Sequence, residues 1–331
     1  MKRLMLMTLA AAVAISAFGA AFAQEKTIKF TTQNPKGHPL VMGMEKFAEI
    51  VQAKSGGKIK VNLFPGGVLG GDAPVVSALQ GGTIEMASMN SGILASQVKD
   101  FEVYDFPFMF ASSKEADAVV DGPFGKKMHA KLEPKGLVGL TYWELGFRQI
   151  TNSKRPINKV EDAEGLKLRV IPNAINVDWV KALGANPTPL AFPEVYAALE
   201  QKAIDGQENP MTVIAANKFF EVQKYATLTN HQYNPQSVLI SKKFWDTLSA
   251  DEKKIISDAA VESTAYQRQQ ARAQANTALE AVKKGGMQVN ELAPAELAKF
   301  REKMKPVVDK HGAAIAETVK ELQAELAKAR Q

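Results

Sequence analysis

The chain has 331 residues, of which 46% are hydrophobic and 23% are charged, and it contains no cysteine. This ordinary composition argues against a disordered, collagen-like or coiled-coil chain, and the length predicts about two domains. Without cysteine, disulfide scaffolds, zinc ribbons, iron–sulfur clusters and thiolate catalysis are excluded. The formal charge of +6 comes from 41 basic and 35 acidic residues without a dense basic run, so we expect no nucleic-acid partner.

The start of the chain is typical of a secretory signal peptide. Lys2 and Arg3 precede a nearly continuous apolar stretch over residues 4–18, and an A-x-A pattern at 21–23 precedes polar residues. The apolar stretch is shorter than the roughly 20 residues that a membrane-spanning helix needs. We therefore expect export to a bacterial periplasm, cleavage after Ala23, and a soluble mature chain without a lipid anchor.

Strand-like and helix-like segments alternate along the rest of the chain. Alternation with period two predicts strands, and apolar residues at a spacing of about 3.6 predict helices. The predicted strands are 27–31, 58–64, 84–89, 137–144, 147–151 and 167–170. The predicted helices are 40–54, 72–80 with Asp72 as its N-cap, 174–183, 193–202 and 314–330. The β-α-β-α-β order of the first five elements predicts a parallel, doubly wound sheet.

A long helix is predicted near the end of the chain. Residues 246–284 are rich in alanine and glutamine and contain no glycine, and the pair Gly285-Gly286 follows directly. A helix through most of it would be about 50 Å long, which is longer than one domain is wide. Its apolar positions are largely alanine, which makes a poor coiled-coil seam. We therefore favour a brace between two domains over a dimerising coiled coil.

Catalytic and cofactor motifs are absent from the sequence. The histidines lack metal-binding spacing, and they are His38, His129, His231 and His311. The glycine-rich segments 66–71 and 122–127 match neither a dinucleotide-binding motif nor a phosphate-binding loop, and no G-x-S-x-G motif occurs. We expect no cofactor and no metal.

Two arginines stand inside or at the end of predicted strands. Arg148 follows Phe147, and Arg169 lies in the segment 165–170 (GLKLRV). A buried arginine needs an anionic partner, and its planar guanidinium matches a carboxylate at two points. Two interpretations stay open on this basis: a salt bridge to a nearby acidic residue, or the binding of an anionic ligand.

Several segments together resemble one family of transport proteins. They are 165–173 (GLKLRVIPN), 183–196 (LGANPTPLAFPEVY), 205–210 (DGQENP), 219–225, 229–231, 30–38 and the Gly-Gly-Asp loop at 70–72. In combination they resemble the DctP-type solute-binding proteins of tripartite ATP-independent periplasmic (TRAP) transporters, over essentially the whole mature chain. The resemblance implies an α/β, periplasmic-binding-protein-like fold. It has two domains, each a mixed sheet flanked by helices, with a long helix spanning both.

The resemblance also implies the domain bounds and the function. The signal peptide is 1–23, domain I is 24–145 plus about 234–272, and domain II is about 146–233 plus 273–331. The implied protein is not an enzyme. It captures a small organic carboxylate in a cleft between the domains and delivers it to the small and large membrane subunits of a TRAP permease. We expect a monomer.

The resemblance assigns site residues one by one. Arg169 is the principal carboxylate clamp, Arg148 a second positive partner, Asn209 an amide that binds the carboxylate, and Phe192 the apolar floor. The other expected ligand-binding residues are Gln33, His38, Asp72, Asn90, Asn173 and Gln236. For His38 a solvent-exposed turn remains an equal alternative, and for Asp72 a purely capping role is preferred.

The ligand class stays open between two candidates. The amides of Asn90 and Gln236 fit a polyhydroxylated acid, which favours a hexuronate such as D-glucuronate or D-galacturonate. A C4-dicarboxylate such as succinate or malate is the second candidate. An exported sugar-acid enzyme is an alternative of another class, with Glu208 as its candidate base, and a ligand-presenting sensor protein is a third.

Overall fold

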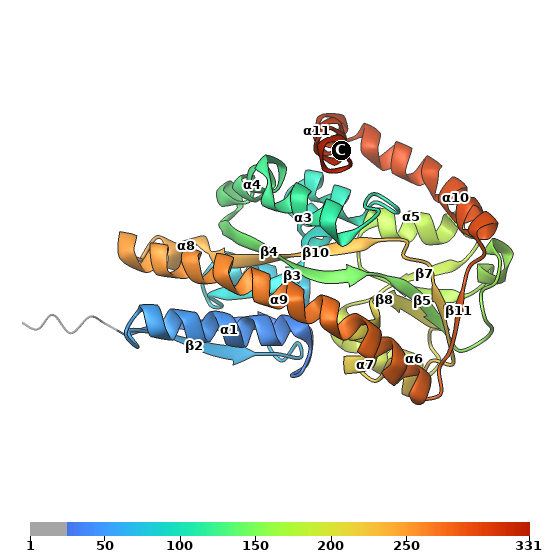
Figure 1. Cartoon of the computed structure of the whole chain (residues 1–331), viewed down its shortest axis with the longest axis horizontal. Coiled ribbons are helices and arrows are strands. Elements are labelled where there is room, and N and C mark those ends of the chain that lie inside the picture. The colour runs from blue at the N-terminus through green and yellow to red at the C-terminus, as the bar shows by residue number, and fades with distance from the viewer. Residues whose placement is uncertain (1–24) are drawn as a thin grey trace, which may run out of the picture.

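The structure is a computed structural model, and it is described for residues 25–331. It contains two β-sheets flanked by helices (Figure 1). The predicted signal peptide and its cleavage point after Ala23 lie outside the described residues. Within residues 25–331, none of the helices combines the length and the apolar character that crossing a bilayer demands.

The first sheet has five strands in the order β2-β1-β3-β10-β4. They are β1 (Lys26–Thr32), β2 (Ile59–Phe64), β3 (Met86–Asn90), β4 (Leu137–Phe147) and β10 (Tyr233–Ser241). β1 pairs in parallel with β2 and β3, whereas β10 runs antiparallel to β3 and β4. The predicted parallel sheet is therefore right for the first three strands only. A strand from much later in the chain inserts beside them, and the local pattern of residues 27–89 cannot indicate it.

The second sheet has six strands in the order β11-β9-β5-β8-β6-β7. They are β5 (Gln149–Asn152), β6 (Lys167–Val170), β7 (Asn186–Pro189), β8 (Gly206–Asn209), β9 (Tyr225–Leu228) and β11 (Gln288–Glu291). β6 pairs in parallel with β7 and β8, and β5 runs antiparallel to β8 and β9. Both sheets are mixed, as expected for the fold class.

Helices cover both sheets. They are α1 (Pro39–Lys54), α2 (Asp72–Gly81), α3 (Ser113–Asp121), α4 (Pro123–Ala130), α5 (Ala174–Ala182), α6 (Val195–Glu200), α7 (Met211–Ala216), α8 (Lys242–Trp245), α9 (Ala250–Lys284), α10 (Pro294–Ala313) and α11 (Ala316–Ala329). The N-cap of α2 is Gly71, whose backbone is extended, and Asp72 is the first helical residue. The prediction of Asp72 as N-cap was wrong by one position.

The chain crosses between the sheets where β4 leads into β5 and where β9 leads into β10. Arg148 is the single residue between β4 and β5. Its backbone N–H donates to the carbonyl oxygen of Gln232, on the β9–β10 connection, over 2.8 Å. The two crossings therefore run side by side, and Arg148 lies where the two halves of the molecule meet.

Helix α9 spans both halves, as predicted. Its start is fixed by a capping box, in which Ser249 Oγ accepts from the Glu252 N–H and the Glu252 carboxylate accepts from the Ser249 N–H. The helix contacts α1 and β4 beside the first sheet and α7 beside the second. Figure 1 shows it running diagonally from one half to the other.

The apolar core holds the two halves together on one side. One cluster of buried residues includes Tyr142 of β4, Ile150 of β5 and Phe300 of α10. A second cluster lies between the first sheet and helices α1 and α9, where the ring of Phe30 contacts those of Phe47 and Trp143. Because the first cluster includes strands of both sheets, the halves share a core on that side.

The predicted division into domains stays a prediction. Helix α11 contacts α3 and α4, beside the first sheet, although the division assigns residues 273–331 to the second domain.

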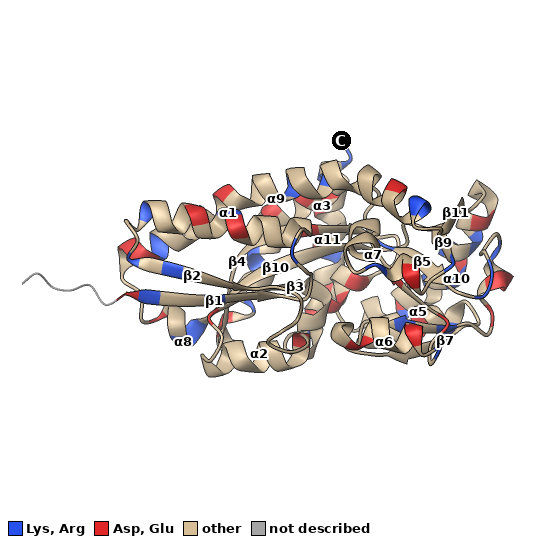
Figure 2. Ribbon diagram, turned by 90° about the horizontal axis from the view of Figure 1, so that it is seen from below, with Lys and Arg blue, Asp and Glu red and all other residues tan. Residues whose placement is uncertain are grey.

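Basic and acidic residues are interspersed over both halves of the molecule (Figure 2).

Candidate ligand-binding site

A small cavity lies between the sheets, at the carboxyl ends of β1, β3, β6 and β8. In α/β sheets this is the usual position of a ligand site. The residues that line it are Thr32, Gln33, Asn34, Asp72, Ser88, Met89, Asn90, Leu145, Arg148, Arg169, Ile171, Phe192, Asn209, Val213 and Gln236. The cavity volume is about 40 Å³. Since one water molecule needs roughly 10–15 Å³ on this measure, the site suits a small ligand.

Most of the predicted site residues line this cavity. They are Gln33, Asp72, Asn90, Arg148, Arg169, Phe192, Asn209 and Gln236. His38 and Asn173 do not line it. The ring nitrogen Nδ1 of His38 accepts from the Leu40 N–H and so caps α1. The amide of Asn173 donates to the Gly92 carbonyl and to Asp105. Both side chains hold local structure in place next to the site.

Arg169 is buried without a carboxylate partner. It is 2% exposed, and its Nε donates to the carbonyl oxygen of Leu190 over 2.9 Å. The ring of Phe192 lies 5.8 Å from its guanidinium carbon. Among residues 25–331 no carboxylate comes within salt-bridge distance of it. Burial lowers the pKa of Arg169 to about 10, so its cation remains at neutral pH and lacks an anion.

Arg148 differs, because its charge is paired inside the protein. Its Nε and Nη2 donate to the two carboxylate oxygens of Glu208, and Nη1 donates to Asn234 over 2.7 Å. Both partners of the ion pair are 1% exposed. Although burial alone would raise the pKa of Glu208, Arg148 and His231 hold it at about 2. The salt-bridge interpretation left open for a strand arginine therefore holds for Arg148, which also lines the cavity.

Asp72 lines the same cavity as Arg169. Asp72 lies on α2, beside the first sheet, whereas Arg169 lies on β6 of the second sheet. Asp72 stands in the first turn of α2 and is half-buried. Burial raises the pKa of Asp72 to about 6, and the charge of Arg169 acts in the opposite direction. The cavity thus contains one unpaired cation and one acidic group.

The wall formed by the first sheet contains polar atoms without partners. Thr32 Oγ1, Gln33 Oε1, Asn34 Oδ1 and Ser88 Oγ are buried, and none has a hydrogen-bond partner in the described part of the chain. Such groups cost free energy unless a ligand or water satisfies them. Sequence reasoning missed Thr32, Asn34 and Ser88, although their position at the ends of parallel strands was the available signal.

A buried carboxylate behind the cavity organises several amides. Asp105 is fully buried and accepts hydrogen bonds from the side chains of Asn90, Asn173, Asn176 and Asn234. Burial raises the pKa of Asp105, while the charge of Arg148 and the amides of Asn176, Asn173 and Asn90 oppose that shift. Asn90 is held with its oxygen on the Gly92 N–H. The sequence around Asp105 is apolar and gave no signal of this role.

Glu208 is a poor candidate for a catalytic base. Its carboxylate is occupied by Arg148 and lies 3.3 Å from His231 Nε2. Its pKa of about 2 keeps it ionised and weakly basic. It is also absent from the cavity lining. The geometry therefore does not support the alternative of an exported enzyme.

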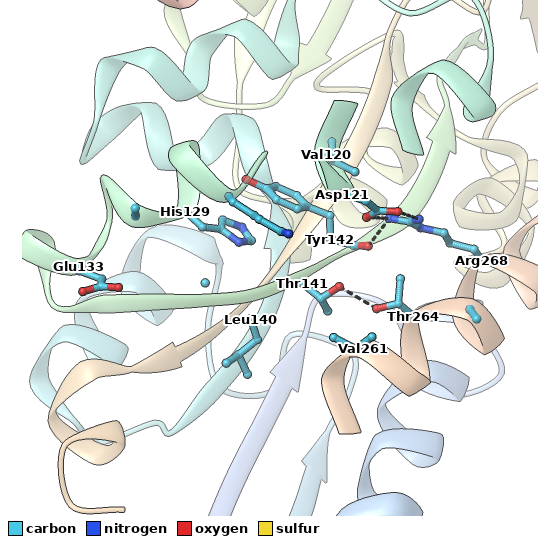
Figure 3. A pocket seen from close by; sticks show the side chains of 14 residues that line it. Val120, Asp121, His129, Glu133, Leu140, Thr141, Tyr142, Val261, Thr264 and Arg268 are labelled. Atoms are coloured by element: carbon cyan, nitrogen blue, oxygen red, sulfur yellow. Dashed lines mark hydrogen bonds and ion pairs between the residues drawn. The ribbon is translucent and has the colours of Figure 1, made fainter. Parts of the chain in front are cut away.

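A second, larger cavity of about 600 Å³ lies between α4, β4 and α9 (Figure 3). The Arg268 guanidinium donates to both oxygens of Asp121 there, over 2.6 and 2.7 Å. Thr141 and Thr264 are hydrogen-bonded to each other. A ligand carboxylate would have to displace Asp121 from Arg268, so the cavity between the sheets is the better candidate site.

Comparison with known proteins shows several periplasmic binding proteins to which the chain is similar. A solved structure of the sugar acid binding protein DctPAm from Advenella mimigardefordensis, in complex with galactonate, is 43% identical, with a TM-score of 0.91 over 92% of this chain and 99% of that chain. The 2,3-diketo-L-gulonate-binding periplasmic protein of Escherichia coli is 34% identical over 83% of this chain and 84% of its own length. The C4-dicarboxylate-binding periplasmic protein DctP of Rhodobacter capsulatus is 35% identical over 90% of each chain.

The family profile covers most of the chain. Residues 30–314 match the family described as "DctP: Bacterial extracellular solute-binding protein, family 7". Proteins of this kind bind small carboxylates and act with TRAP permeases in transport; they are not enzymes. The chain belongs to this DctP family of TRAP solute-binding proteins.

Proposed function

We propose that the protein binds a sugar acid in the periplasm, with a hexuronate such as D-glucuronate or D-galacturonate as the leading candidate. The carboxylate lies on Arg169, and the cavity between the two sheets encloses the rest of the ligand. One observation supports this most strongly: Arg169 is buried, and among residues 25–331 no carboxylate lies within salt-bridge distance of it.

The positive charge of Arg169 is the reason to expect a carboxylate on the ligand. Nε is committed to Leu190, which leaves the Nη side of the guanidinium available to a bidentate ligand. Asn209 lines the same cavity, and its side-chain amide supplies a further polar contact beside the clamp. The ring of Phe192 packs near the guanidinium and excludes water from the pair.

The polar atoms of the first sheet account for the hydroxyl groups. Gln33, Asn34, Thr32 and Ser88 place unpartnered oxygen atoms at the cavity. A polyhydroxylated chain satisfies such atoms, whereas the methylene groups of succinate do not. Two of the compared relatives are named for sugar-acid binding.

A C4-dicarboxylate is the second candidate, because the R. capsulatus relative is named for that ligand. In the described residues, however, Arg169 is the one cavity arginine without a carboxylate partner. A second ligand carboxylate would have no cation of its own.

The transport cycle follows from the buried position of the site. A ligand reaches Arg169 only when the two halves separate, and it contacts both halves only when they close. The closed complex then docks on the small and large membrane subunits of a TRAP permease. An ion gradient across the membrane supplies the energy for transport through the permease. We infer that the binding protein acts as a monomer.

A thermal-shift screen of the purified chain tests this proposal. The compounds are hexuronates, aldonates, C4-dicarboxylates, sialate and oxo-acids. A true ligand at a hundredfold excess over its Kd stabilises the protein by about 2.7 kcal/mol, which moves the melting temperature visibly. A shift with sugar acids supports the proposal, a shift with dicarboxylates alone supports the second candidate, and no shift with any carboxylate contradicts both.

A further inference from the structure

We propose that Asp72 selects the ligand by charge: its carboxylate accepts a hydrogen bond from a ligand hydroxyl and repels a second carboxylate. The site then takes polyhydroxylated monocarboxylates and rejects dicarboxylates with the same carbon chain. This inference rests on the proposed function, because it assumes that a sugar-acid carboxylate occupies Arg169.

The placement of Asp72 is the first support. Asp72 and Arg169 line one cavity, Asp72 from the first turn of α2 and Arg169 from β6. Throughout residues 25–331, no lysine, arginine or histidine lies within 4.0 Å of the Asp72 carboxylate. The Asp72 carboxylate and the Arg169 guanidinium are not paired with each other. They therefore suit a ligand that has a carboxylate for Arg169 and a hydroxyl group that donates to Asp72.

Adjacent glutamine and backbone groups do not neutralise Asp72. The Gln33 amide donates to the Gly70 carbonyl over 3.0 Å, and a hydrogen bond from the same uncharged side chain lowers the pKa of Asp72 without cancelling its charge. Arg169 is the charged residue that acts on Asp72. When a ligand carboxylate binds Arg169, it neutralises the charge of that guanidinium. The Asp72 carboxylate then remains able to accept a hydrogen bond from another group of the ligand. A hydroxyl group satisfies this acceptor, whereas a second carboxylate brings two like charges together in a buried site.

The ionisation of Asp72 makes the selection dependent on pH. Burial raises its pKa to about 6, with Arg169 opposing the shift. Asp72 is therefore charged at pH 7.5 and largely protonated at pH 5. Protonation removes the repulsion and adds a donor, so the penalty against a dicarboxylate diminishes below pH 6. Ordinary carboxyl groups titrate near pH 4, so a dicarboxylate is still ionised at pH 5.

The experiment compares three six-carbon acids by calorimetry. D-Galactonate and D-galacturonate have one carboxylate, and galactarate has a carboxylate at both ends of the same chain. The wild type, Asp72→Asn and the control Asp251→Asn are each measured at pH 7.5 and pH 5. Asp251 is a fitting control, because it is an exposed aspartate in the first turn of α9, as Asp72 is in the first turn of α2.

The wild type and Asp251→Asn are expected to bind a monocarboxylate about tenfold or more tightly than galactarate at pH 7.5. Asp72→Asn is expected to gain about tenfold or more in galactarate affinity, because asparagine has the same shape without the charge. In the wild type, galactarate affinity rises from pH 7.5 to pH 5. In Asp72→Asn this change disappears.

The outcomes separate the two proposals. If the variants and the wild type bind a monocarboxylate and reject galactarate alike, and the wild type shows no gain at pH 5, the role of Asp72 is overturned while the proposed function stands. If the wild type binds neither monocarboxylate nor any other sugar acid, the proposed function fails and the role of Asp72 fails with it. The pH series needs only the wild type, so it tests the role of Asp72 even if Asp72→Asn does not fold.

Discussion

Arg148 and Glu208 form a buried two-point ion pair, with Arg148 Nη2 2.8 Å from Glu208 Oε1. Arg169 lines the same cavity, but within residues 25–331 the Leu190 carbonyl is the one hydrogen-bond acceptor of its side chain. The charge of Arg148 is therefore neutralised within the fold, whereas we propose that the charge of Arg169 binds the ligand. The two arginines that the sequence singles out have different roles, and this difference leads to opposite expectations for their variants.

Glu208→Gln is expected to lower the free energy of unfolding of the ligand-free protein by about 3–5 kcal/mol, because it leaves the buried cation of Arg148 without its partner. Urea unfolding at pH 7.5 measures the change. Glu221→Gln is a suitable control, since its ion pair with Lys218 is exposed and such pairs contribute about 1 kcal/mol at most. Equal effects of the two substitutions would contradict the structural role of the Arg148–Glu208 pair.

The same ion pair predicts loss of stability in acid. The pKa of Glu208 is about 2 in the folded protein, below its ordinary value of 4.5. A carboxyl group with a lowered folded pKa contributes stability above its unfolded pKa and loses it as the pH falls. The contribution is therefore complete above pH 4.5 and is lost between pH 4.5 and pH 2. In Glu208→Gln this part of the decline should be missing from unfolding curves recorded across that range.

Arg169→Ala is expected to weaken sugar-acid binding by about 2–5 kcal/mol, roughly thirty- to several-thousand-fold, since the desolvated ligand carboxylate loses its partner. Arg169→Met keeps the apolar stem and should bind as poorly, yet its ligand-free form should unfold with a free energy no lower than that of the wild type. Calorimetry and urea unfolding measure the two properties. A loss of less than about threefold in affinity, or a clear destabilisation of Arg169→Met, would show that Arg169 is structural instead.

The sequence could predict the elements with strong local signals. Helix α1 and strand β1 follow from hydrophobic periodicity, and α9 follows from a long segment without breakers after the capping residue Ser249. By contrast, β8 consists of the polar residues GQEN, all buried, and no periodic pattern marks it. Its side chains are satisfied by tertiary hydrogen bonds, such as that of Gln207 to Thr151. Only the assembled sheet explains why these residues form a strand.

The site could be predicted in part for a related reason. Residues on short recognisable segments, such as Arg169 and Asn209, line the cavity, and their role in ligand binding stays a prediction. The direction of a side chain is set by contacts distant in sequence, and for Arg148 the sequence left a salt bridge and an anionic ligand open as alternatives. Its partner Glu208 is 60 positions away. The four amides that bind Asp105 come from three separate segments, since Asn173 and Asn176 both lie at the start of α5. No local pattern predicts such a cluster.

His38→Asn is expected to flatten the pH dependence of stability above pH 5. Burial lowers the pKa of His38 and of His129 to about 3 each, so both are neutral in the folded protein. Their contribution to stability is complete above the unfolded pKa of about 6.5 and falls by up to about 1.4 kcal/mol per pH unit for each histidine below it. Asparagine retains the cap of α1 without titrating. The free energy of unfolding is compared at pH 7.5 and pH 5, and an unchanged slope in the variant would contradict the expectation.

Gly71→Leu is expected to hinder closure of the two halves over the ligand. Gly71 belongs to the loop before α2, and a Cβ there would lie 3.4 Å from the Cβ of Ala191 and 4.0 Å from Pro193 Cδ, on the loop after β7. Its φ of −70° suits any residue, so backbone strain does not interfere. A single methyl group fits at these distances, but the longer leucine side chain extends into the opposite loop.

Gly71→Ala is therefore the matched control, and it also reproduces the loss of glycine at the N-cap of α2. We expect the alanine variant to bind sugar acid within about threefold of the wild type and the leucine variant to bind about tenfold or more weakly, through faster dissociation. The unfolding free energies of the two ligand-free variants should be similar, because the obstruction acts only when the halves close. Calorimetry and stopped-flow dissociation measure the effect. If both variants release the ligand at the same rate, the contact between Gly71 and Ala191 does not limit closure.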